Sequence, residues 1–97
     1  MNVAYTDKFV LNGEVVIKKG VTPGNGVIPD TVSVTAITIA SASNVTFAVK
    51  GLNANAAYAD VESGQFTIEG LDDNSPMYFY VKTTSGITMN LFVKGQV

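Results

Sequence analysis

The composition of this 97-residue chain removes most catalytic chemistry before any motif is considered. The sequence contains no His, Cys or Trp, and a count along it finds no Arg, so an imidazole base, a thiolate nucleophile and a guanidinium clamp are excluded. Charged residues make up 14% of the chain against 46% hydrophobic residues, and the formal net charge is -2. A basic surface that could neutralise phosphates is missing, so we expect no nucleic-acid partner.

The length predicts one domain, residues 1–97, because single domains usually contain about 100 to 200 residues. The absence of Cys fits a reducing compartment, or a particle assembled in one. The first ten residues lack the basic segment followed by an apolar run that marks a signal peptide. No stretch approaches the roughly 20 apolar residues of a membrane span. We therefore expect a soluble chain with no membrane partner.

The first elements are two strands and a long loop. Residues 5–11 and 14–19 flank Asn12 and Gly13, a strong hairpin signal because both residue types tolerate positive φ. Residues 20–30 follow with two Pro and three Gly. Such a segment cannot form a central strand, so it is predicted to be a long loop.

Residues 31–40 predict a strand whose phase changes. The apolar positions alternate as far as Ala36, after which Ile37 and Ile39 take over the apolar face. Such a slip indicates a bulge, or a strand that crosses from one sheet to another.

Two further strands follow a short polar segment. Residues 45–50 alternate as a half-buried strand should. Residues 56–62 and 65–69 flank Ser63 and Gly64, which predicts another tight hairpin.

The last two strands are predicted at residues 77–84 and 87–94, joined by a hairpin at Ser85 and Gly86. Seven or eight short strands with no helical period indicate an all-β fold. We expect an antiparallel β-sandwich, with a small barrel as the alternative.

The stretch from Ser63 to Val81 resembles a segment of known modules. It is similar to the Gly-x-Phe-x-Ile-x-x-Leu … Tyr-x-x-x-Val pattern shared by fibronectin type III, Cna-B-type and other Ig-like sandwiches. The resemblance implies an Ig-like β-sandwich. The Cna-B likeness further implies an isopeptide bond from Lys8 or Lys18 to Asn90, near Glu69.

The composition carries a second resemblance. A short chain rich in Val, Thr, Ala, Asn and Gly, without Cys, is similar in style to small phage virion proteins of the decoration or auxiliary type.

The densest acidic cluster lies at Asp72 and Asp73, close to Glu69. Carboxylate oxygens suit Ca²⁺, which takes six to eight oxygen ligands, so these two residues are the candidate metal ligands. A surface corner also needs polar turn formers, and this structural role is the alternative.

Tyr78, Tyr80 and Phe92 are the candidate partner-binding residues. The alternation places them on the face opposite the core, on strands that the predicted turn at Ser85 and Gly86 makes neighbours. Exposed aromatic patches mark protein or glycan binding. Plain cross-strand packing of the aromatic rings is the alternative.

These observations predict a non-enzymatic structural or interaction protein without a cofactor, whose partner is another protein or a second copy. The most concrete form is a phage virion component, a capsid decoration or auxiliary protein located in the virion. The alternative is an Ig-like adhesion or carbohydrate-binding module of a bacterial cell surface. The candidate aromatic residues next to the acidic corner favour this alternative.

Overall fold

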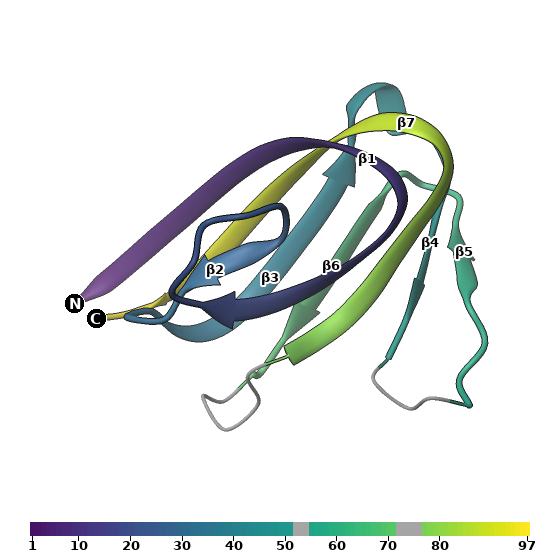
Figure 1. The fold of residues 1–97 in the computed structure, drawn as a ribbon. Helices are drawn as coiled ribbons and strands as arrows, with labels where there is room; N and C mark the ends of the chain where they lie inside the picture. Colours follow the sequence, from purple (N-terminus) through teal and green to yellow (C-terminus); the bar gives the residue numbers. More distant parts are fainter. Residues whose placement is uncertain (52–54, 72–76) are drawn as a thin grey trace.

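Strands account for nearly all of the regular structure (Figure 1). The computed structural model of the protein describes residues 1–51, 55–71 and 77–97. Within these residues the elements are β1 (Asn2–Gly20), β2 (Val27–Pro29), β3 (Ser33–Ser41), the 3₁₀ turn η1 (Ala42–Asn44), β4 (Phe47–Lys50), β5 (Ala59–Val61), β6 (Gln65–Glu69) and β7 (Met77–Gln96). All strand pairs are antiparallel except β1 with β2. The predicted all-β, antiparallel fold is confirmed.

The two longest strands, β1 and β7, pair with each other and arch over together (Figure 1). Their register has two stretches, residues 2–11 with 87–96 and residues 13–18 with 77–83. At the corner between the stretches, Asn12 alone faces residues 84–86, and these extra residues of β7 bend both strands. Gly13 lies at the corner with a φ of 99°, a conformation that glycine adopts without steric cost.

The hairpins predicted at Asn12 and Gly13 and at Ser85 and Gly86 are therefore wrong. Both pairs of residues lie inside continuous strands, where they form the two sides of one corner. The buried Thr83 hydroxyl donates a hydrogen bond of 3.1 Å to the carbonyl of Leu11 beside this corner. That bond gives a partner to a backbone group at the point where the ladder is interrupted.

The corner folds one continuous sheet into two facing layers. Layer one consists of residues 2–11 of β1, residues 87–96 of β7, β3 and β6. Layer two consists of β2, residues 13–20 of β1, residues 77–83 of β7, β4 and β5. The result is a nearly closed, barrel-like sheet rather than two separate sheets, because strands that switch layers by bending keep the ladder continuous.

The hydrophobic core lies between the two layers. Phe66 of layer one and Phe79 of layer two meet edge to face, with ring centroids 5.3 Å apart. The largest fully buried side chains come from both layers: Ile17, Ile28, Ile37, Ile39, Met89, Leu91, Val34, Val81 and Val93. Burial of apolar area of this kind is the main favourable term in folding.

Two bulges change the direction of individual side chains. Thr35 is the extra residue of β3 where the register with β7 shifts between Val34 and Ala36, so the predicted phase slip at Ala36 is confirmed as a bulge. Tyr78 is the extra residue of β7 where β1 steps from Ile17 to Lys18. Bulges turn the inserted side chain away from the simple alternation.

The hairpin predicted at Ser63 and Gly64 is also wrong: this turn joins strands of different layers, because β5 pairs with β4 and β6 pairs with β3. The loop predicted at residues 20–30 contains the short edge strand β2, held by a hydrogen bond of 3.0 Å from Lys18 N to Gly26 O.

In the described residues, no helical segment has the length and apolar character needed to cross a membrane.

Candidate interaction surface

The structure separates the three aromatic residues that the sequence grouped together. Phe92 lies on the outer face of layer one and is 52% exposed. Tyr80 lies on layer two, half-buried between its cross-strand partners Val16 and Lys50. Tyr78 is only 8% exposed and belongs to the core. Because β7 is continuous, no hairpin brings Phe92 beside the two tyrosines.

Phe92 lies in the middle row of the outer face of layer one, which we call the Phe92 face. The cross-strand row through it contains Thr6 on one side and Thr38 on the other. Thr38 in turn pairs with Thr67, and the two hydroxyl oxygens lie 3.0 Å apart. The neighbouring rows of this face are Lys8, Asn90, Ala40 and Gln65, and Ala4, Lys94, Ala36 and Glu69. None of these side chains is large and apolar, so the Phe92 ring is the single aromatic group of the three rows.

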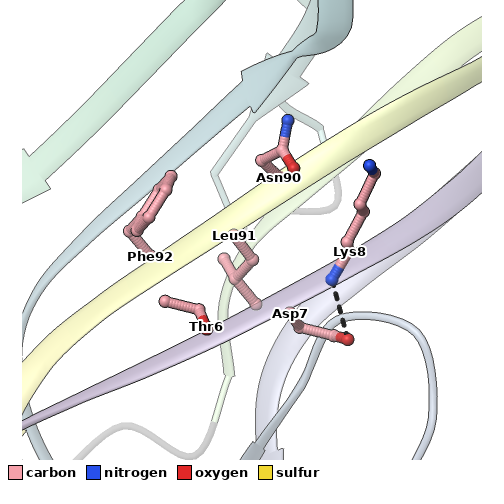
Figure 2. Close-up of a pocket in the computed structure, with 6 residues that line it drawn as sticks. All are labelled: Thr6, Asp7, Lys8, Asn90, Leu91 and Phe92. Atoms are coloured by element: carbon pink, nitrogen blue, oxygen red, sulfur yellow. Dashed lines mark hydrogen bonds between the residues drawn. The ribbon is translucent and has the colours of Figure 1, made fainter.

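A shallow hollow of about 530 Å³ lies beside the Phe92 ring (Figure 2). Its lining residues are Thr6, Asp7, Lys8, Asn90, Leu91 and Phe92. Figure 2 shows Phe92 at one end of the hollow, with Lys8 and Asn90 on neighbouring strands at the other. The hollow offers one aromatic ring beside an ammonium, a carboxylate, a hydroxyl and an amide. Of these groups, the aromatic ring is the kind that is enriched in protein contact surfaces.

The β1 edge of layer one is protected against strand pairing. Residues 2–11 of β1 pair with β7, whereas β2 pairs only with residues 18–20 of β1. On this free edge the Asp7 carboxylate accepts a hydrogen bond of 2.9 Å from the backbone N–H of Lys8. A charge that occupies a backbone donor of an edge strand disfavours the addition of another strand. The geometry therefore favours contact through the face over contact through this edge.

Lys8 and Asn90 are direct cross-strand partners, which bears on the isopeptide bond that the Cna-B resemblance implies. Lys18 lies on layer two and pairs with Met77 instead. Isopeptide formation needs a neutral amine and a group that moves its proton, conditions that burial and a close carboxyl group provide. Lys8 is exposed, and Glu69 lies in another cross-strand row.

We therefore expect the purified protein to have the unmodified mass calculated from its sequence. Intact-mass spectrometry checks this directly. A mass lower by one ammonia, with a cross-linked Lys8–Asn90 peptide after digestion, would contradict the expectation.

Layer two carries a second surface feature, a tyrosine–lysine cluster made of Lys50, Tyr58, Tyr80 and Lys82. The Lys50 Nζ lies 5.1 Å from the Tyr58 ring centroid and 5.2 Å from that of Tyr80, and the Lys82 Nζ lies 5.5 Å from the Tyr58 ring. The Tyr58 hydroxyl donates a hydrogen bond to the Glu14 carboxylate. Burial, together with this carboxylate, raises the pKa of Tyr58 above its ordinary value, so the hydroxyl stays protonated and remains a donor.

The Tyr58–Glu14 contact could not be predicted from the sequence, since the two residues are 44 positions apart and only the pairing of β1, β7 and β4 brings them together. Asp72 and Asp73, the candidate metal ligands, lie outside the described residues. Among the residues that are described, no group of three or more acidic, His or Cys side chains could hold a metal ion.

Comparison with known proteins gives no relative. No protein-family model, no curated protein and no solved structure matches the chain.

Proposed function

We propose that the protein is a non-enzymatic structural protein that binds another protein through the Phe92 face. Its most concrete form is a phage virion component, a capsid decoration or auxiliary protein located on the particle. The observation that carries the proposal is the half-exposed Phe92 ring, the one aromatic group in three rows of a four-stranded face that otherwise consists of Ala, polar and charged side chains.

The energetics of such a face favour binding. Complete burial of a Phe side chain is worth about 1.5–3 kcal/mol, and roughly half of that remains to be gained at a ring that is 52% exposed. Aromatic anchors surrounded by near-neutral contacts are typical of binding hot spots. The face is built on paired strands, so little conformational entropy is lost when a partner covers it.

The residue inventory supports a structural role over a catalytic one. With no His or Cys in the sequence, no Ser or Thr hydroxyl has an imidazole to activate it. The low charge and the high content of Val and Thr are similar in style to small virion proteins, and this likeness is the basis for proposing a place on a particle.

Sedimentation of particles tests the proposal. When purified phage particles are mixed with the protein and sedimented, the wild-type protein should co-sediment with the particles. Phe92→Asp should stay in the soluble fraction while retaining its β-sheet circular dichroism. Val45→Asp is the matched control, because Val45 is a 43% exposed apolar residue outside the Phe92 face. The proposal fails if the wild type never co-sediments, or if Phe92→Asp binds particles as well as Val45→Asp does.

A further inference from the structure

The outer surface of layer two contains an open cleft that the Phe92 face does not use. Its volume is about 440 Å³, and its lining residues are Thr46, Phe47, Ala48, Tyr58, Asp60, Lys82 and Thr83. These residues come from β4 and the residue before it, from β5 and the segment before it, and from the first half of β7, so the cleft crosses three paired strands.

The floor of the cleft is a small residue between two charged ones. Ala48 is the cross-strand partner of Lys82 on one side and of Asp60 on the other. In the part of the chain that the structure describes, Lys82 and Asp60 form no ion pair with each other, and the Lys82 ammonium lies over the Tyr58 ring instead. A donor and an acceptor therefore flank a hollow that the Ala48 methyl group does not fill.

The wall of the cleft is an aromatic ring held in place from several strands. The Tyr58 hydroxyl is bonded to Glu14 of β1, and the Lys50 ammonium of β4 lies 5.1 Å from the ring centroid. Contacts of this kind fix the ring before a ligand arrives, which reduces the entropy lost on binding.

The charges around the cleft balance. Lys50 and Lys82 contribute two positive charges, and Glu14 and Asp60 contribute two negative charges, so neither an anion nor a cation is attracted by a net field. A carbohydrate hydroxyl both donates and accepts hydrogen bonds, so it can bond to Asp60 and Lys82 together.

From this arrangement we infer that the cleft is a binding site for a neutral carbohydrate. Asp60 accepts hydrogen bonds from the sugar hydroxyls, Lys82 donates to them, and Ala48 leaves the space for the ring. The inference is independent of the proposed function, because the cleft and the Phe92 face lie on different layers of the molecule.

A glycan array that carries neutral oligosaccharides of hexoses and N-acetylhexosamines, together with sialylated and sulfated glycans, tests the inference. Wild-type protein should bind one or more neutral glycans. Asp60→Asn should reduce that binding by about tenfold or more, the loss expected for one hydrogen bond to a charged group. Ala48→Leu, which fills the hollow, should reduce it to a similar extent.

Two controls separate the cleft from other effects. Glu62→Gln removes an exposed carboxylate that does not line the cleft and should bind like the wild type. Phe92→Ser should also bind like the wild type, so failure of the particle experiment and failure of this one are distinguishable. Asp60 is exposed, so Asp60→Asn keeps the test valid even if Ala48→Leu does not fold.

The inference is overturned if no neutral glycan binds, if only acidic glycans bind, or if Asp60→Asn binds as tightly as Glu62→Gln.

Discussion

Gly95→Ala should destabilise the protein by about 3 kcal/mol, the upper part of the range for overpacking a well-packed site. A Cβ on Gly95 would lie 2.3 Å from the carbonyl oxygen of Ser33 and 2.7 Å from the Val32 Cγ1. Ser33 begins β3 and pairs with Gln96 of β7, next to the Val34–Gly95 pair, so its backbone cannot move away without disturbing the ladder. In a thermal melt the loss should lower Tm by roughly 10–20 °C.

Gly86→Ala in the same strand is the matched control. A Cβ at Gly86 would meet only the Val10 Cγ1, at 3.7 Å, an ordinary van der Waals distance. We expect its effect on the free energy of unfolding to stay within about 0.5 kcal/mol, as for other unhindered surface substitutions. Equal losses for the two variants would show that β3 and β7 do not approach each other at Gly95 as described.

Leu91→Ala should cost about 2–5 kcal/mol, because it opens a cavity in the core at a side chain with no exposed surface. Phe92→Thr, at the next position of β7, should change stability by less than about 1 kcal/mol, since the ring is half-exposed and Thr suits a strand. Urea unfolding of both variants measures the difference. A larger loss for Phe92→Thr than for Leu91→Ala would mean that β7 presents the opposite residues to the core.

The same comparison separates folding from function. Leu91→Ala should leave the Phe92 face chemically unchanged in the fraction that remains folded, whereas Phe92→Thr should remove its aromatic anchor without loss of fold. A binding defect that follows Phe92 and not Leu91 is therefore a defect of the surface.

The alternation of the last strand was readable from the sequence because it is a local property. Phe92 was predicted to point away from the core, and this prediction is confirmed, since the ring is 52% exposed while Met89, Leu91 and Val93 are buried. The bulge near Ala36 was readable for the same reason, since the slip is visible in the order of apolar residues.

The corner could not be predicted, because its local signal is the same as that of a hairpin. Asn12 and Gly13 permit positive φ in a two-residue turn and equally in a bend of a continuous strand. What decides is the partner of β1, and that partner, β7, lies more than 60 positions further along the chain. Once β1 and β7 pair on both sides of the corner, the two predicted turns coincide and form one bend.

In the candidate sites too, features set by local alternation could be predicted, and features set by long-range strand pairing could not. The outward direction of Phe92 followed from alternation, but the burial of Tyr78 depends on a bulge whose position is set by the register with β1. The cleft beside Ala48 depends on three strands and on Tyr58, whose bond to Glu14 joins distant parts of the sequence. No window of neighbouring residues contains that information.

Site-specific photo-cross-linking in the assembled particle tests the central claim most directly. The photoreactive amino acid p-benzoylphenylalanine replaces Phe92 in one variant and Tyr80 in another, and the particles are irradiated before denaturing electrophoresis. The proposed function predicts that position 92, on layer one, cross-links to a structural protein of the particle, while position 80, on layer two, does not. Cross-links from position 80 with none from position 92 would contradict the claim that the Phe92 face is the contact surface.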